Sequence, residues 1–347
     1  MTSPIPIQNL YYLLCYAWEK FPEGKAIDVG TTESPEVVDL FAFVLSNGLR
    51  RLIRRGLDRG YVEVGEELIS VRGRIALQET IRRNLLSSAR VSCRYDELQH
   101  DVLHNQIIKA TVSCLADAEN LSPDLAHELR GLSGFLRNVT NIRLLPHLFR
   151  RVQLSRNVRH YDFLLKLCEL IHDCLLPQEG GAKSKFADIL KDEARMSAIF
   201  ENFVRNFYRM EQREFQVGSE VIIWAAEATN PLHLAYLPSM RTDVSLRSAD
   251  RTIILDTKYY SQTLARYMGT EKIWSGHLYQ LFAYLKNSEH RGGPDRVAEG
   301  ILLYPAVGQP LDLEYLFGDH VVRVKTINLD AHWTTIRQQL LEILRRS

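Results

Sequence analysis

Three charged residues in the second half of the chain have the types and spacing of a phosphodiester-cleaving site. Asp256 and Lys258 directly follow the apolar run 253–255. Alternate side chains of a strand point to the same face, so these two should project together while Thr257 projects away. Asp243 lies on the preceding strand-like segment, and the polar stretch 247–251 predicts a hairpin between the two. The pattern therefore predicts that two carboxylates and one amine meet on one face.

Two carboxylates and an amine suit metal-dependent hydrolysis of a phosphodiester. Carboxylate oxygens are ligands that Mg²⁺ prefers, and the bound ion stabilises charge on a phosphate and lowers the pKa of a bound water. The ammonium of Lys258 would orient that water or stabilise the transition state, and it would act as a base only with a depressed pKa. A strand that simply leaves the core for solvent can also end in Asp-x-Lys, so this motif alone is a weak signal.

Three further polar residues lie on the helices expected beside these strands. Gln280 and Tyr284 share one face of an otherwise apolar helix, and their spacing resembles the Gln-x-x-x-Tyr element of RecB-like nucleases. Glu201 lies at the edge of an apolar helical stripe, where it is either a metal ligand or a solvated flank. The predicted catalytic residues are Asp243, Asp256, Lys258, Gln280, Glu201 and Tyr284. The predicted metal ligands are Asp243, Asp256 and Glu201.

The predicted elements give an α/β (α+β) protein of two domains, 1–160 and 161–347. The first half reads as mostly helical, with a small β element whose turn is expected at 66–67. Its predicted elements are helices over 8–21, 36–57 and 103–121, a helix after 122–124, and strands within 61–75. The predicted elements of the second half are helices over 193–214, 271–287 and 331–345 and strands over 221–225, 240–246, 252–259, 300–304 and 321–327.

Charge and cysteine content narrow the class of protein. The 43 Lys and Arg balance 42 Asp and Glu, so a global basic field cannot drive binding to nucleic acid. Contact with DNA must come from a partner or from local patches. Two arginine clusters are either solvated faces or such patches: Arg50, Arg51, Arg54, Arg55 and Arg59, and Arg150, Arg151, Arg156 and Arg159. Five cysteines without a Cys-x-x-Cys pair disfavour a disulfide framework and a cysteine zinc site.

Several other signals predict what the chain lacks. The apolar run 10–18 is short and is followed at once by Glu19 and Lys20, so we expect no signal peptide, no membrane span and a cytoplasmic protein. His100 and His104 have the spacing of a metalloprotease helix, but Asp101 stands where that motif has Glu and no third ligand is evident. The glycines form no phosphate-binding loop, so the chain should not bind a nucleotide by itself.

The order of acid-bearing helix, Asp strand, Asp-x-Lys strand and Gln helix is similar to that of PD-(D/E)xK nucleases. The usual proline before the first acid is absent, since Arg241 and Thr242 precede Asp243, and Asp256 replaces Glu. A closer resemblance covers essentially the whole chain. The motifs that resemble the McrC family are 5–18, Arg72-Gly-Arg-Ile75, Asn105-Gln-Ile-Ile-Lys109, 237–243, 266–272, His277-Leu-Tyr-Gln-Leu281 and Leu302-Leu-Tyr-Pro305.

The resemblance implies the nuclease subunit of an McrBC-type, modification-dependent (type IV) restriction system that defends against foreign DNA. It implies a restriction-endonuclease-like domain with a central mixed sheet flanked by helices, and catalytic roles for Asp243, Asp256 and Lys258. It also implies a partner, an McrB-like AAA+ GTPase hexamer that binds GTP and recognises modified cytosine in double-stranded DNA. The N-terminal domain would dock on this ring and stimulate GTP hydrolysis. Two alternatives stay open: a non-cleaving regulatory or scaffold subunit, and a stand-alone RecB-like nuclease that needs no partner.

Overall fold

The structure is a computed structural model that describes residues 5–19, 36–177, 184–186, 189–259, 265–267, 270–306 and 310–345. It divides into two compact units. The sheet unit comprises Met1–Thr32 and Asp188–Ser347, and the helical unit comprises Glu33–Ala187. The expected boundary near residue 160 therefore differs from the structural one, and the first helix belongs with the C-terminal part of the chain. The assignment of docking to one part and cleavage to the other stays a prediction.

The first helix, α1 (Ile7–Ala17), joins the sheet unit because of its packing on α9 (Glu193–Glu211). The ring of Tyr16 packs against Phe203 and Phe207, with centroids 5.9 and 5.4 Å away. The buried side chain of Asn9 donates hydrogen bonds of 2.8 Å to the carbonyls of Leu329 and Ala331. These contacts link residues about 200 and 320 positions apart, which sequence periodicity cannot reveal.

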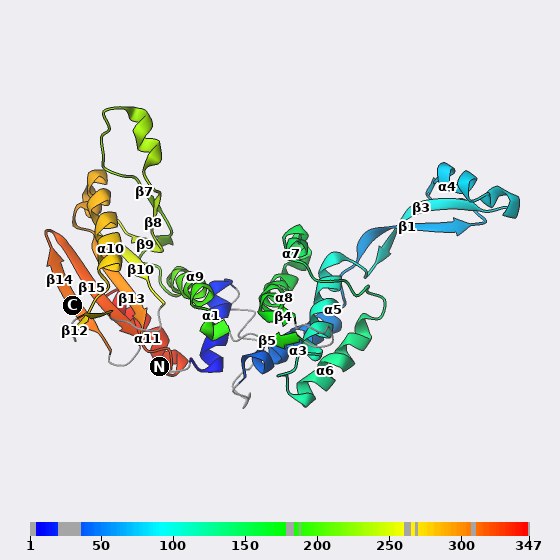
Figure 1. Ribbon diagram of the computed structural model, residues 1–347, viewed down its shortest axis with the longest axis horizontal. Helices are drawn as coiled ribbons and strands as arrows, with labels where there is room; N and C mark the ends of the chain where they lie inside the picture. Colours follow the sequence, from blue (N-terminus) through cyan, green and yellow to red (C-terminus); the bar gives the residue numbers. More distant parts are fainter. Residues whose placement is uncertain are drawn as a thin grey trace. The chain divides into compact units, whose positions relative to one another are not determined.

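A six-stranded mixed sheet forms the centre of the sheet unit, in the order β14-β15-β13-β10-β9-β6 (Figure 1). Its strands are β6 (Gln216–Gly218), β9 (Val244–Arg247), β10 (Thr252–Thr257), β13 (Glu299–Pro305), β14 (Asp312–Phe317) and β15 (His320–Ile327). Strand β10 is parallel to β13 and antiparallel to β9, and all six of its residues are buried. The predicted α/β class with a central mixed sheet is thereby confirmed.

Helices flank this sheet. On one side, α10 (Ser275–Ser288) packs Leu281 and Leu285 against Ile254 and Leu302. Helix α9 contacts β9 and β10, and α11 (Trp333–Ile343) contacts β15. Gly300 on β13 permits the close approach of α10, because a Cβ there would lie 2.9 Å from a methyl of Leu285. The helix that carries Gln280 is thus held directly over the strand that carries Asp256.

Among its described residues, the helical unit contains four helices of 11 to 19 residues, a six-residue helix packed on two of them and a three-stranded sheet. The helices are α3 (Val37–Arg55), α5 (Leu103–Ala116), α6 (Pro123–Ser133), α7 (Pro146–Arg151) and α8 (Asp162–Cys174). Strands β1 (Gly60–Leu68) and β3 (Val91–Gln99) pair along their full lengths, with β2 (Arg74–Ile75) on the other side of β3. Figure 1 shows these strands as an arm that leaves the helices of this unit, with α4 (Leu77–Arg82) at its far end. We call residues 60–99 the arm.

The arm corrects the prediction of a turn at 66–67. Strand β1 continues through these positions to Leu68, and its partner β3 was not predicted. The reason is that much of the arm faces water on both sides, so few apolar residues mark the alternation of a strand. Gly73 has a positive φ of 68° and lies where a Cβ would approach the carbonyl oxygen of Arg94 to 2.4 Å. A glycine is therefore required where the chain passes over β3.

The remaining elements are short. The short strands are β4 (Leu175–Pro177), β5 (Ser184–Phe186), β7 (Val221–Ile222), β8 (Met240–Arg241), β11 (Ala265–Tyr267) and β12 (Thr270–Lys272). The 3-10 helices are η1 (Leu85–Ser88), η2 (Gly134–Leu136), η3 (Arg156–Tyr161), η4 (Ile189–Lys191), η5 (Pro231–Tyr236), η6 (Glu289–Arg291) and η7 (Gly293–Val297). The helix predicted from residue 271 begins at Ser275, after β12. No helix in the described ranges has the length and hydropathy that crossing a bilayer requires.

Candidate active site

Asp256 and Lys258 lie at the carboxyl end of β10, beside the parallel strand β13. The backbone N–H of Lys258 donates to the carbonyl of Leu303 at 2.9 Å, so β13 also fixes the residue after the strand. The carboxylate of Asp256 is fully buried, and the side chain of Lys258 is 13% exposed. Lys258 Nζ lies 2.8 Å from Asp256 Oδ2. The expected projection of these two side chains to the same side is confirmed by this ion pair.

Asp243 reaches the same place from the neighbouring strand. It immediately precedes Val244, the first residue of β9, which pairs with Leu255 of β10 in the antiparallel ladder. Its Oδ2 accepts hydrogen bonds from the backbone N–H of Thr257 at 2.7 Å and from the Thr257 hydroxyl at 2.8 Å. Thr257 was expected to point away from the site, but its hydroxyl orients one of the two acids.

A chain of hydrogen bonds connects the lysine to the helix above the strand. Lys258 Nζ donates to Gln280 Oε1 at 3.0 Å, and Gln280 Nε2 donates to the hydroxyl of Tyr284 at 2.7 Å. The hydroxyl of Tyr284 donates to the carbonyl of Arg241 at 2.8 Å. The structure therefore joins Asp256, Lys258, Gln280 and Tyr284 in one network, and Gln280 and Tyr284 share one helical face as their spacing predicted. Their catalytic roles stay a prediction.

Glu201 is held differently from the other two acids. Its Oε1 forms an ion pair of 2.7 Å with Arg205, one helical turn later on α9. The same Arg205 nitrogen donates to the carbonyl of Asp243 at 3.0 Å, and Arg205 also contacts Asn202. Glu201 is near enough for its charge to raise the pKa of Asp256. Among the described residues, no three His, Cys, Asp or Glu side chains form a group that could hold a metal, so a ligand role for Glu201 remains a prediction.

The electrostatics of Asp256 are unusual for an aspartate. Burial, and next the negative charge of Asp243, raise the pKa of its carboxyl from 3.8 to about 7, although Lys258 opposes the shift. Its Oδ1 is buried and has no hydrogen-bond partner in the part of the chain that the structure describes. A buried carboxyl whose pKa is raised by a neighbouring acid, and which has an unsatisfied oxygen, fits a divalent cation, because the ion would offset the repulsion between the two acids and use that oxygen.

Sequence reasoning gave no role to His277, although it lies three residues before Gln280 on the same helix. Its Nδ1 lies 2.9 Å from the hydroxyl of Tyr304, and burial and the charge of Lys258 lower its pKa to about 4. A neutral imidazole therefore neighbours the ammonium. Its spacing from Gln280, one helical turn, is the signal that could have identified it.

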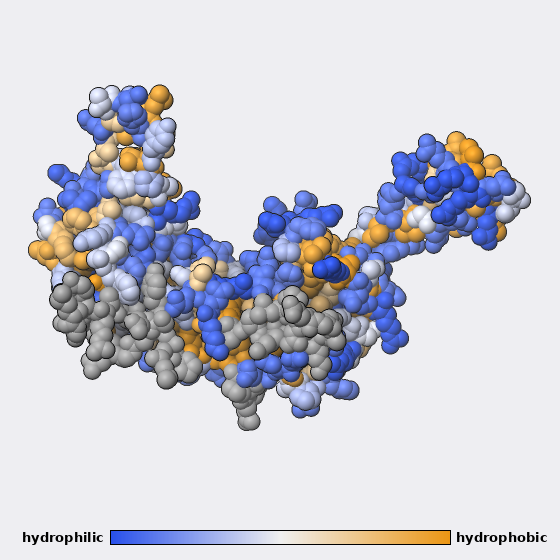
Figure 2. Space-filling model, viewed as in Figure 1, coloured by the Kyte–Doolittle hydropathy of each residue, from blue (hydrophilic) through white to orange (hydrophobic). Residues whose placement is uncertain are grey.

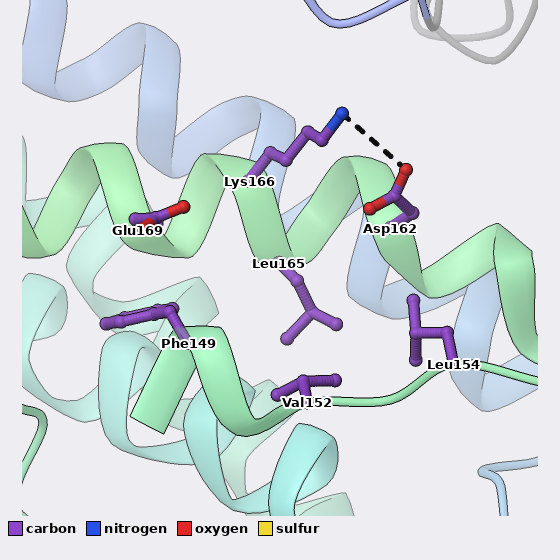
Figure 3. Close-up of a pocket in the computed structure, with 7 residues that line it drawn as sticks. All are labelled: Phe149, Val152, Leu154, Asp162, Leu165, Lys166 and Glu169. Carbon is purple, nitrogen blue, oxygen red and sulfur yellow. Dashed lines mark ion pairs between the residues drawn. The ribbon is translucent and has the colours of Figure 1, made fainter. Parts of the chain in front are cut away.

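The helical unit contains a separate cavity of about 340 Å³ between α7, the segment after it, and α8. Figure 3 shows Leu165 facing Val152 across it, with Lys166 directed toward Asp162, 3.7 Å away. Burial raises the pKa of Glu169 at its rim. The lining is apolar apart from these charged groups. The cavity is therefore better suited to receive an apolar side chain than to carry out catalysis. The two histidines of the 100–104 segment contact Asp58, through its backbone carbonyl and its carboxylate.

The fold and this arrangement define a mixed-sheet α/β protein with two acids and a lysine at the end of a central strand. A model of the family described as "McrBC 5-methylcytosine restriction system component" matches residues 7–305. The chain belongs to this family, and the resemblance to McrC is confirmed.

Two comparisons with individual proteins agree. The chain is 32% identical over 339 residues to the Escherichia coli (strain K12) protein called "Type IV methyl-directed restriction enzyme EcoKMcrBC", covering 98% of this chain and 97% of that protein. A chain in the refined half-complex of a tetradecameric assembly of Thermococcus gammatolerans McrB AAA+ hexamers with bound McrC has the same fold. That similarity has a TM-score of 0.58 at 20% identity and covers 98% of this chain and 76% of that one.

Proposed function

We propose that this chain is the Mg²⁺-dependent endonuclease subunit of a cytoplasmic restriction system. It cleaves double-stranded DNA that carries modified cytosine, as part of an assembly with an McrB-like AAA+ GTPase hexamer. The observation that carries the proposal is the pair Asp243 and Asp256, whose mutual repulsion and unsatisfied oxygen fit a divalent cation. The PD-(D/E)xK assignment accounts for this pair and for Lys258 together.

Each residue of the site has a role in this proposal. Asp243 and Asp256 would hold Mg²⁺, which when bound would supply Lewis-acid stabilisation of the scissile phosphate and lower the pKa of a water. Thr257 fixes the orientation of the Asp243 carboxylate through two hydrogen bonds. The ammonium of Lys258 orients the attacking water and stabilises charge that develops on the phosphate oxygens. It is held in place by Gln280, which Tyr284 positions in turn.

The partner follows from family membership and from one feature of the helical unit. The far half of the arm exposes large apolar side chains: Ile69, Val71, Ile75, Leu77, Ile81 and Leu86. Figure 2 shows apolar surface at this end of the arm. Exposed apolar patches mark protein interaction sites, which supports docking of the helical unit on the ring. In this proposal the ring binds GTP, and this chain, which has no phosphate-binding loop of its own, does not. Docking stimulates GTP hydrolysis.

Cleavage by the assembled system tests this proposal. The full chain is mixed with an McrB-like ring, GTP, Mg²⁺ and DNA containing 5-methylcytosine. The wild-type chain should cut the DNA, while Asp256→Ala and Lys258→Ala should abolish cutting and retain the stimulated GTPase activity. Asp250→Ala is a matched control, because Asp250 is an exposed acid on the adjacent hairpin. Full cleavage by Asp256→Ala would refute the proposed site.

The same experiment separates the alternatives. A regulatory or scaffold subunit would stimulate GTP hydrolysis without any cutting by the wild-type chain. A stand-alone nuclease would cut the DNA when the ring and GTP are left out. Cleavage that requires the ring, GTP and an intact Asp256 is the result that the proposal expects.

A further inference from the structure

A hairpin of the sheet unit, residues 221–241, exposes large apolar side chains beside the candidate site. It consists of β7, η5 and β8, and Figure 1 shows η5 at its far end, away from the sheet. Tyr236 is 86% exposed and Leu232 is 74% exposed, and Ile223 and Leu234 are exposed as well. We call this segment the η5 hairpin. Isolated exposed apolar residues are ordinary, but four on one short projection indicate a contact surface.

The η5 hairpin is held in a defined conformation. Trp224 Nε1 donates to the carbonyl of Pro238 at 2.6 Å, which ties its two strands together above the β7–β8 pairing. The backbone N–H of Ala225 donates to Asn287 Oδ1 of α10 at 2.8 Å. The side chain of Asn230 accepts from the N–H of Leu232 at 3.0 Å and caps η5. These bonds present the apolar side chains to solvent on a supported frame.

The base of the η5 hairpin belongs to the candidate active site. The carbonyl of Arg241 accepts the hydrogen bond from Tyr284, and Asp243 is the second residue after Arg241. Tyr236 precedes Asp243 by seven residues, and an extended chain spans about 3.5 Å per residue, so their Cα atoms lie within about 25 Å. Duplex DNA rises about 3.4 Å per base pair. The tip can therefore reach about seven base pairs from a phosphate held at Asp243.

We infer that the η5 hairpin is a DNA wedge, which places Tyr236 and Leu232 against bases at most about seven base pairs from the phosphate that is cut. The inference rests on the proposed function, because a duplex at Asp243 and Asp256 lies beside this hairpin. Apolar wedges and aromatic rings bind bases by partial unstacking and by stacking. The charged residues of the hairpin are one acid, Glu227, and one base, Arg241. It is therefore suited to the faces of bases rather than to the phosphate backbone.

Base unstacking measures this contact directly. An Asp256→Asn chain, assembled with the ring and GTP, is bound to 5-methylcytosine duplexes that carry 2-aminopurine at single positions scanned along the whole duplex. The fluorescence of 2-aminopurine rises when the base leaves the stack. Adding Leu232→Ala and Tyr236→Ala should remove this rise. In the otherwise wild-type chain the same two changes should lower cleavage at least about fivefold, since base stacking on an aromatic ring contributes at least that much.

A matched control and two contrary outcomes make the test decisive. Leu316→Ala removes an equally exposed leucine, 72% against 74%, from β14 at the opposite edge of the sheet, and it should change nothing. Unchanged fluorescence and cleavage in the double variant would overturn the inference. So would a loss of ring binding or of GTPase stimulation with the base signal intact, because the hairpin would then dock on protein. If the wild-type chain cuts no DNA, the proposed function fails, while the fluorescence still reports separately on the wedge.

Discussion

The candidate active site and the arm use opposite physical arrangements. At the end of β10, charged side chains are buried and each is positioned by a neighbour, as Lys258 is by Asp256 and Gln280. On the arm, large apolar side chains such as Ile81 and Leu86 remain exposed to water. Catalysis requires charges fixed before the substrate arrives, and association requires apolar surface that only a partner buries. The two regions should therefore respond to substitution in different assays.

Replacement of Lys258 by Met should have the largest effect. It removes the ammonium that stabilises transition-state charge, and comparable losses in other enzymes lower the rate by about 10²–10³-fold. It also removes the group that lowers the pKa of Asp256, so that pKa should rise above about 7. The measurements are the cleavage rate in the assembled system and its dependence on pH, which should shift toward alkaline pH. Ring binding should stay unchanged, and a loss of ring binding would contradict the separation of the two regions.

Charge placed on the arm should have the next largest effect. It should weaken docking on the ring and stimulation of the GTPase, not the chemistry of cleavage. Ile81→Asp with Leu86→Asp puts two carboxylates into a surface that docking would bury without partners. The concentration of this chain needed to stimulate the GTPase should rise at least about tenfold. Leu316→Asp is the control, since it adds a charge at an exposed leucine of the sheet unit. Normal stimulation by the double variant would place the docking surface elsewhere.

The pH dependence of stability should give the smallest effect. The pKa of Asp256 is raised in the folded state, so its stabilising contribution is complete below pH 3.8 and is lost as pH rises through about 7. At pH 8, Mg²⁺ should restore part of the stability and raise Tm by a few degrees, and EDTA should reverse this. Asp256→Asn should remove the Mg²⁺ shift, whereas the arm variant should keep it. Thermal unfolding with and without Mg²⁺ measures both.

The elements that sequence periodicity predicted are those with one clearly buried face. Helix α9, predicted over 193–214, and strand β15, predicted over 321–327, agree with the structure within a few residues. Strand β14 was missed because it is a mostly exposed edge strand, and such strands show little alternation of apolar residues. Strand β3 was missed because polar or charged residues occupy more than half of its positions. The division into units was also misplaced, since it depends on contacts such as that between Tyr16 and Phe207.

The candidate site likewise contains features that the sequence predicted and contacts that it did not. Gln280 and Tyr284 were expected on one face of their helix, and the structure joins them by a hydrogen bond. The bonds from Thr257 to Asp243, and from Arg205 to the carbonyl of Asp243, were not expected. They depend on how the chain turns between β8 and β9, which local sequence patterns do not specify. Residue types thus predicted which groups would meet, and tertiary geometry determined what orients them.

The discontinuity of the sheet unit has a consequence for synthesis and for dissection of the protein. A ribosome releases α1 first, but its surface on α9 and its hydrogen-bond acceptors at Leu329 and Ala331 emerge only near the end of translation. The helical unit can complete its own fold in the interval. A truncated chain that starts after residue 187 would keep the candidate active site but lack α1. It would expose Phe203 and Phe207 and would be prone to aggregate. Residues 5–19 joined by a linker to residues 189–345 should give a better-behaved fragment for crystallisation.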